Sequence, residues 1–290
     1  MTALDELPDQ NQRDAADFLA IQRVRDEIDN RLRKLRTTRE VFFGGVIRRA
    51  IDEVLSLGEK RFSIEQLDSP EKTYIGTRVE MLVRDALDVG RGAHADALIA
   101  EHEVDIKWSK SSSWMIGPEN LGTVCLGIGT TKDNTKFSVG LFVPHRDLIR
   151  PGSNRDQKLS LSSEFYDKRV EWMVMRAETP ANFFAALAPE IRDDILSRPS
   201  AQQRLQRLAE LVHDTPVPRS AIVFAALNKN DPMRRIRADK SRKHPPLGDM
   251  VCLSERYDKA LLSRLGTVLP AEHFYFVKQT TLDALDPPLG

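Results

Sequence analysis

The segment at residues 104–108, Val-Asp-Ile-Lys-Trp, places an acid and a lysine two residues apart. Its residue types favour a β-strand, in which side chains two residues apart project from the same face. On that face, Asp105 can hold a divalent metal ion, and Lys107 can orient or help to deprotonate an attacking water molecule. The backbone carbonyl of Ile106 could add a metal ligand. The segment therefore predicts a site for metal-assisted hydrolysis of a phosphate ester.

Two further carboxylates precede this segment. Asp96 lies nine residues before Asp105, and Glu80 lies near the middle of an expected helix. Clustered oxygen ligands of this kind suit Mg²⁺, with water and phosphate oxygens completing its shell. Taken alone, Glu80 could simply pair with Arg84, four residues on. Asp96 could equally cap a turn, and Lys107 could be a solvated charge, so the four residues form a candidate site only as a set.

The surrounding elements indicate an α/β domain over residues 14–155, after a polar tail at residues 1–13. Three segments have apolar residues every three or four positions, which predicts amphipathic helices. These segments are residues 14–35, 41–55 and 73–87. Three later segments have the residue types of β-strands. These are residues 102–108, 124–128 and 137–143.

A polar break follows the last of these strands. Residues 151–154 read Pro-Gly-Ser-Asn, and few residues before 163 suit a core. We therefore expect a domain boundary here, with a second, mostly helical domain over residues 156–290. Its expected helices are residues 180–196, 201–212, 219–227 and 255–265. Its expected strands are residues 170–177, 250–254 and 273–277.

Charge is balanced over the whole chain but not locally. Lys+Arg and Asp+Glu both number 43, so an affinity for nucleic acid must come from a local patch. Residues 229–243 contain seven basic and two acidic residues, a local charge of +5. Such a segment predicts salt-dependent binding of a polyanion, with a solvated basic loop as the alternative. Its candidate DNA-binding residues are Arg234, Arg235, Arg237, Lys240, Arg242 and Lys243.

Several function classes are not supported. Cys125 and Cys252 are too few for a disulfide framework or a zinc site, which favours a reducing cytosol. The chain has no signal-peptide pattern and no apolar run of about 20 residues, so we expect a cytoplasmic protein without a membrane partner. It also has no P-loop, dinucleotide fingerprint or Gly-x-Ser-x-Gly motif.

Three motifs resemble the NaeI family of type II restriction endonucleases. They are Tyr-Ile-Gly-Thr-Arg-Val-Glu at 74–80, Glu-Val-Asp-Ile-Lys at 103–107 and Trp-Met-Ile at 114–116. By this resemblance Glu80, Asp96, Asp105 and Lys107 take the catalytic positions of a PD-(D/E)xK nuclease, with Ala95-Asp96 in place of Pro-Asp. Weaker similarity at residues 218–220 and 233–237 extends to the family's C-terminal domain.

The resemblance implies a restriction-endonuclease-like N-terminal domain and a winged-helix or helix-turn-helix-like C-terminal domain. It implies a Mg²⁺-dependent type II enzyme that cuts double-stranded DNA at a GC-rich palindrome, while the C-terminal domain binds a second DNA copy. The implied metal ligands are Asp96, Asp105, the Ile106 carbonyl and Glu80. A palindrome suits a homodimer with two DNA copies per dimer, in the bacterial cytoplasm. Further expected DNA contacts are Ser109, Lys110, Ser111, Ser112, Ser113 and Arg219.

Two other functions remain open, because a nuclease fold does not fix its substrate. One is a repair or recombination nuclease without strict site specificity. The other is a non-catalytic DNA-binding protein whose nuclease domain has lost its activity. Cleavage at many sequences would favour the first, and binding without metal-dependent cleavage would favour the second.

Overall fold

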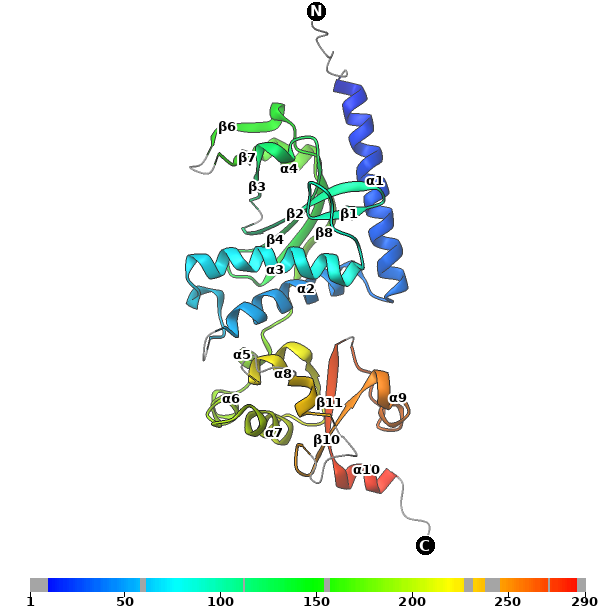
Figure 1. Cartoon of the computed structure of the whole chain (residues 1–290), viewed down its shortest axis with the longest axis vertical. Helices are drawn as coiled ribbons and strands as arrows, with labels where there is room; N and C mark the ends of the chain where they lie inside the picture. The colour runs from blue at the N-terminus through cyan, green and yellow to red at the C-terminus, as the bar shows by residue number, and fades with distance from the viewer. Residues whose placement is uncertain are drawn as a thin grey trace, which may run out of the picture. The chain divides into compact units, whose positions relative to one another are not determined.

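The structure is a computed structural model that describes residues 10–57, 61–111, 113–153, 157–226, 232–237, 246–270 and 272–285. The chain divides into two compact units (Figure 1). The first comprises the described parts of Met1–Ala50 and Ser69–Pro180, and the second those of Ile51–Asp68 and Ala181–Gly290. No helix within the described residues is both long and apolar enough to span a bilayer.

The division between the units comes later than the polar break at residues 151–163 suggested. Strand β8 (Glu171–Glu178) pairs antiparallel with β5 (Lys136–Phe142), so the chain up to Pro180 belongs to the first unit. Within the polar break, β6 (Ile149–Ser153) and β7 (Leu159–Leu161) form a small sheet with β3 (Met115–Ile116). The described residues of this polar segment therefore belong to the first unit and do not mark its end.

The main sheet of the first unit has the strand order β1-β2-β4-β5-β8. Strand β2 (His102–Lys110) pairs parallel with β4 (Val124–Thr130), and antiparallel with β1 (Ala97–Ile99). The remaining pairs are antiparallel, which makes the sheet mixed. Every residue of β4 is buried, as expected for a strand at the centre of a sheet.

Three long helices accompany this sheet, and all three were predicted. They are α1 (Gln10–Lys34), α2 (Arg39–Leu55) and α3 (Ser69–Leu87). The apolar stripe of α1 is buried from Ile21 to Leu32, whereas Phe18 and Leu35, at its ends, are exposed. Helix α3 contacts β2, and Figure 1 shows it lying across the strands. Burial of one apolar face thus fixes α3 beside the strand that carries Asp105.

A second core cluster packs beside the small sheet. Trp114 stacks on Phe142 with ring centroids 5.1 Å apart, and Phe165 of α4 (Ser163–Lys168) meets Phe142 edge-on. A Cβ at Gly127 would lie 2.5 Å from the Trp114 ring, so only glycine fits beneath this indole. Short 3₁₀ helices at Pro118–Asn120 and Arg146–Leu148 complete the connections.

The second unit combines short helices with an antiparallel sheet of order β10-β11-β9. Its strands are β9 (Pro216–Pro218), β10 (Met250–Ser254) and β11 (His273–Lys278). Its α-helices are α5 (Phe183–Ala186), α6 (Pro189–Leu196), α7 (Ala201–Leu211), α8 (Arg219–Ala225), α9 (Glu255–Arg264) and α10 (Gln279–Leu285). Two 3₁₀ helices, Ile64–Gln66 and η4 (Pro232–Arg235), also belong to it.

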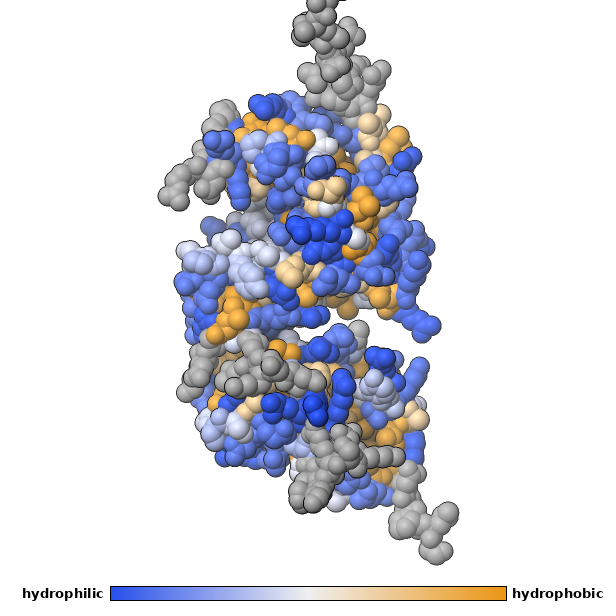
Figure 2. Space-filling view, in the orientation of Figure 1, coloured by the Kyte–Doolittle hydropathy of each residue, from blue (hydrophilic) through white to orange (hydrophobic). Residues whose placement is uncertain are grey.

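One expected helix of the second unit is divided. Residues 180–196 were predicted as a single helix, but they form α5 and α6. Leu187 ends α5 in an extended conformation, and Pro189 then begins α6. Proline suits the first turn of a helix but not its interior, which explains the break. Figure 2 shows that the visible face of each unit is mostly hydrophilic, with hydrophobic residues in small separate patches.

Candidate active site

Strand β2 presents Asp105 and Lys107 on one face, as its alternation predicted. The Lys107 Nζ lies 2.7 Å from the Asp105 carboxylate, to which it donates a hydrogen bond. Asp105 is only 5% exposed, whereas Lys107 is half-buried. In the parallel ladder with β4, Asp105 is paired with Cys125 and Lys107 with Gly127. The acid and the lysine are thus fixed by a regular sheet.

The hairpin of β1 and β2 delivers Asp96 to the same place. Ala97 is paired with Val104, so continuing this register by one residue brings Asp96 level with Asp105. The Asp96 Oδ2 accepts a hydrogen bond of 2.8 Å from the backbone N–H of Ile106. The connection between the strands is only two residues long, and both Ala100 and Glu101 have positive φ.

Helix α3 contributes Glu80 to this group. The pKa of Glu80 is raised to about 7, first because of burial and then because of the negative charge of Asp96, with a smaller effect from Asp105. Lys107 acts in the opposite direction. The alternative partner Arg84 donates a 2.9 Å hydrogen bond to the Asp96 carbonyl instead. Glu80 therefore belongs electrostatically to the same cluster as the other three residues.

The four side chains form what we call the carboxylate cluster, Glu80, Asp96, Asp105 and Lys107, with three potential negative charges and one positive. Burial, opposed by Lys107 and assisted by Asp96, raises the pKa of Asp105. Burial lowers the pKa of Lys107, but the attraction of Asp105 outweighs this effect, so the net shift is upward. The pKa shifts of Glu80, Asp105 and Lys107 all favour the uptake of positive charge.

This preference matches the chemistry of a hard divalent cation, which carboxylate and carbonyl oxygens bind. Among the described residues, however, no three His, Cys, Asp or Glu side chains already stand as a ligand set for one ion. The Asp105 carboxylate is occupied by Lys107, and that of Asp96 by the Ile106 amide. The donor types therefore fit Mg²⁺.

The serine-rich segment after β2 is held close to the sheet. The Ser111 N–H donates to the Thr130 carbonyl over 2.7 Å, and the Ser109 hydroxyl donates to the Ser113 carbonyl over 2.9 Å. Ser111 and Ser113 are exposed, and Ser109 and Lys110 are half-buried. Ser112 lies outside the described residues. The segment directly continues the strand that carries Asp105 and Lys107.

The predicted basic residues lie in the second unit. Arg219 begins α8, and its Nε is 3.5 Å from the Glu272 carboxylate. Arg234 and Arg237 are exposed, and Arg235 is half-buried. Lys240, Arg242 and Lys243 lie outside the described residues. The structure thus places part of the basic segment at η4 and its end, which α8 contacts.

Three residues that contact this site were not predicted as functional. Arg84 holds the Asp96 carbonyl. Cys125 lies with its Sγ 3.9 Å from Asp105 Oδ2, and burial raises the pKa of its thiol. Glu103 accepts hydrogen bonds from three backbone N–H groups of the segment before Asp96. Of these, only Glu103 had a sequence signal, because it shares the face of β2 with Asp105 and lies within the motif at residues 103–107.

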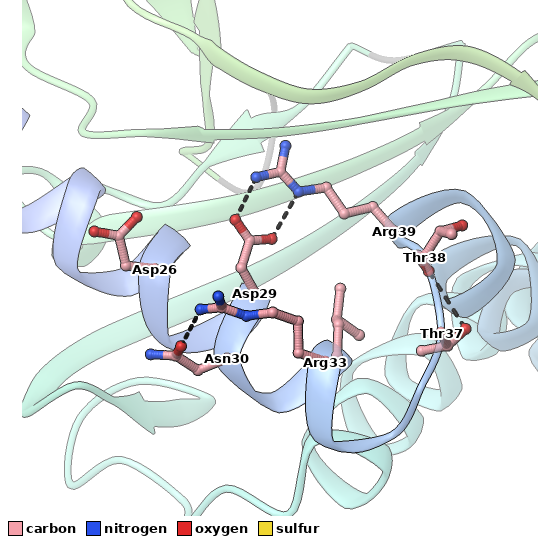
Figure 3. Close-up of a pocket in the computed structure, with 8 residues that line it drawn as sticks. Asp26, Asp29, Asn30, Arg33, Thr37, Thr38 and Arg39 are labelled. Carbon is pink, nitrogen blue, oxygen red and sulfur yellow. Dashed lines mark hydrogen bonds and ion pairs between the residues drawn. The ribbon is translucent and has the colours of Figure 1, made fainter.

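A separate cavity of about 590 Å³ lies between the end of α1 and the start of α2 (Figure 3). In its lining, Arg39 forms a bidentate ion pair with Asp29, with 2.7 Å between Arg39 Nε and Asp29 Oδ1. No member of the carboxylate cluster lines it. Because it lies apart from the carboxylate cluster and its main ion pair is internal, we assign it no catalytic role.

The mixed sheet and its adjoining helices are consistent with a restriction-endonuclease-like fold. Comparison with known families agrees, because residues 26–279 match the family model described as Restriction endonuclease NaeI. The chain belongs to this NaeI family of restriction endonucleases, which confirms the resemblance found in its motifs. The protein called Type II restriction enzyme NaeI, from Lentzea aerocolonigenes, is 28% identical over 237 residues, covering 78% of this chain and 74% of that relative.

Proposed function

We propose that this chain is a Mg²⁺-dependent type II restriction endonuclease, which hydrolyses double-stranded DNA at a specific, GC-rich palindromic sequence. The observation that carries this proposal is the carboxylate cluster, in which three acids and one lysine converge at the β1–β2 hairpin of a restriction-endonuclease family member. The similarity to a type II enzyme supports site-specific cleavage. Because its substrate is DNA that enters the cell, the proposal also places the enzyme in the bacterial cytoplasm.

In this proposal, Asp96, Asp105, the Ile106 carbonyl and Glu80 would hold Mg²⁺. When bound, the metal supplies Lewis-acid polarisation of the scissile phosphate and lowers the pKa of a coordinated water. Lys107 Nζ orients the attacking water and donates a hydrogen bond to a phosphate oxygen, where negative charge develops. A new bond forms between the water oxygen and phosphorus while the bond from phosphorus to O3′ breaks, leaving a 5′-phosphate and a 3′-hydroxyl.

In the metal-free protein, Glu80 is the group of the cluster best suited to take up a proton near neutral pH. A carboxyl with a pKa of about 7 can gain and lose a proton near neutral pH, whereas an ordinary glutamate is already ionised there. Its raised pKa comes mainly from burial and from the negative charge of Asp96. A cation held by the cluster would oppose both effects and favour the ionised form.

We further propose that the chain acts as a homodimer and that its second unit binds another copy of the DNA. A palindrome presents the same cutting geometry on both strands, which twofold symmetry matches. We propose that the second unit is a winged-helix or helix-turn-helix-like module. The contacts of α7 with α8 and of α8 with η4, together with a three-stranded sheet, support this proposal. Its exposed Arg234 and Arg237 lie within the basic segment at residues 229–243.

The decisive experiment is cleavage of unmethylated plasmid and bacteriophage DNA with Mg²⁺, with EDTA and with Lys107→Ala. We expect discrete fragments that require both the metal and Lys107. Lys136→Ala is the matched control, because Lys136 is a half-buried lysine of β5 that pairs with Glu178 of the edge strand β8, far in the sheet order from β2. Fragments without defined ends would indicate a repair or recombination nuclease. Binding without cleavage would instead indicate a DNA-binding protein that has lost its catalytic activity.

A further inference from the structure

A single carboxylate organises the segment that precedes Asp96. Glu103, on β2, accepts hydrogen bonds from three successive backbone N–H groups at residues 93–95, over 2.7, 3.2 and 2.8 Å. The bond from Ala93 is the main reason that the pKa of Glu103 lies below its usual value. Three amide donors on one carboxylate form a compact anion-binding turn, here filled from within the protein.

The turn is built closely around this carboxylate. A Cβ added to Gly92 would lie 2.2 Å from Glu103 Oε2 and 2.8 Å from the Ala95 carbonyl oxygen. Both distances are shorter than non-bonded atoms tolerate, so the turn requires glycine at this position. Any side chain at residue 92 would therefore displace the Glu103 carboxylate from the turn.

Asp96 follows this turn directly and is held at two further points. Its carbonyl accepts the hydrogen bond from Arg84, and its Oδ2 accepts the one from the Ile106 N–H. Glu103 thus holds the segment that leads to Asp96, and Arg84 holds the backbone carbonyl of Asp96. The Ile106 N–H holds its carboxylate. Of the three, Glu103 holds the longest stretch of chain, residues 93–95.

We propose that Glu103 is a positioning residue, which acts on catalysis by setting the place of Asp96 in the carboxylate cluster. The catalytic part of this inference rests on the proposed endonuclease function, whereas the clamp on residues 93–95 does not. Glu103, Asp105 and Lys107 alternate on one face of β2, yet the Glu103 carboxylate is engaged by amides and not by Lys107. Its charge therefore stabilises the turn and leaves cation binding to the other three acids.

The clamp can be tested without any nuclease activity, by amide hydrogen exchange of the peptide that covers residues 92–97. In Glu103→Ala we expect exchange at residues 93–95 to accelerate about tenfold or more, because the acceptor of all three hydrogen bonds is removed. Glu103→Gln keeps one acceptor oxygen, so its exchange rate should lie between those of the parent protein and Glu103→Ala. Glu101→Gln, which removes the same charge from an exposed turn two residues away, should match the parent protein. Unchanged exchange in Glu103→Ala would overturn the clamp.

The catalytic effect is tested by Mg²⁺ titration of single-turnover cleavage. Displacing Asp96 by about 1 Å is expected to lower the cleavage rate about 10²-fold in Glu103→Ala. The half-saturating Mg²⁺ concentration should rise, DNA affinity should stay constant, and Glu103→Gln should restore part of the rate. The positioning role would be overturned if the cleavage rate fell only in proportion to the fraction of unfolded protein and the half-saturating Mg²⁺ concentration did not change. An inactive parent protein would instead refute the proposed function and leave the exchange result standing.

A double variant tests whether Gly92 and Glu103 act together. Gly92→Ala should accelerate exchange and lower the cleavage rate as Glu103→Ala does, because its methyl group displaces the carboxylate. If this steric dependence is the cause, the double variant should lose much less than the product of the two single losses. Losses that multiply would show that the two residues act independently, which contradicts the proposal.

Discussion

In the first unit, Glu80, Asp96 and Asp105 are drawn from a long helix and a regular hairpin, and Asp105 is only 5% exposed. In the second unit, Arg234 and Arg237 are exposed, at the end of a four-residue 3₁₀ helix and just beyond it. The first region holds like charges together at the expense of raised pKa values. The second region presents its arginine side chains to solvent. Rigid elements thus suit the proposed chemistry, and an exposed segment suits contact with a long polyanion.

Removing one carboxylate of the cluster should distinguish the two regions most clearly, because it should impair cleavage and leave DNA binding intact. We expect Asp105→Asn to lower the single-turnover cleavage rate about 10³-fold, because electrostatic groups at a reacting centre contribute on that scale. DNA affinity, measured by fluorescence anisotropy without cleavage, should change little. Asp85→Asn is the control, since Asp85 is an exposed acid on α3. An equal fall in affinity would mean that Asp105 serves binding and not chemistry.

The cost of assembling the cluster should appear in the pH dependence of stability. The folded pKa of Glu80, about 7, lies above its ordinary value of 4.5, so the folded protein binds this proton more tightly than the unfolded chain. Its contribution is therefore fully present below pH 4.5 and is lost as pH rises to about 7. Metal-free Glu80→Gln should avoid this loss, which is about 1 to 2 kcal/mol once solvent screening of this partly exposed side chain is included. Urea unfolding at about pH 5 and about pH 8 measures it, and a constant difference between variant and parent would refute it.

The basic segment should give the smallest effect. Arg234→Ala and Arg237→Ala should each weaken DNA binding severalfold and reduce the slope of log affinity against log salt by about 0.9 for each phosphate that is no longer neutralised. The cleavage rate at saturating DNA should not change. Arg256→Ala serves as the control, because Arg256 lies over the Tyr257 ring on α9, away from the basic segment in sequence. Unchanged salt slopes would remove the basic segment from the DNA-binding surface.

Sequence periodicity predicted the long elements well. The helices α1, α2, α3 and α7 and the strands β2, β4 and β5 lie close to their expected positions. Strands of two or three residues, such as β1, β3 and β9, were not predicted, because so short a segment has no measurable alternation. Their positions depend on which strand they pair with, and that is set by the folded sheet.

The candidate site was predictable to the extent that it depends on alternation. Asp105 and Lys107 share a face because they are two residues apart in a strand. Asp96 and Glu80 were candidates because they are nearby carboxylates. The family resemblance decided in their favour, since no local pattern links a helix or a turn to that strand. The place of Glu103 on this face was predictable, but the hydrogen-bond partners of Glu103 and Arg84 were not, because these partners are backbone groups, which every residue type provides.

The hairpin between β1 and β2 limits how this chain can vary. Ala100 and Glu101 occupy a two-residue turn with positive φ at both positions, where Asn-Gly would be more favourable. Substitutions there keep the length of the turn. An insertion or deletion of one residue would instead shift Asp96 against Asp105 and move side chains to the opposite face. Members of this family should therefore differ more readily in the residues of this turn than in its length.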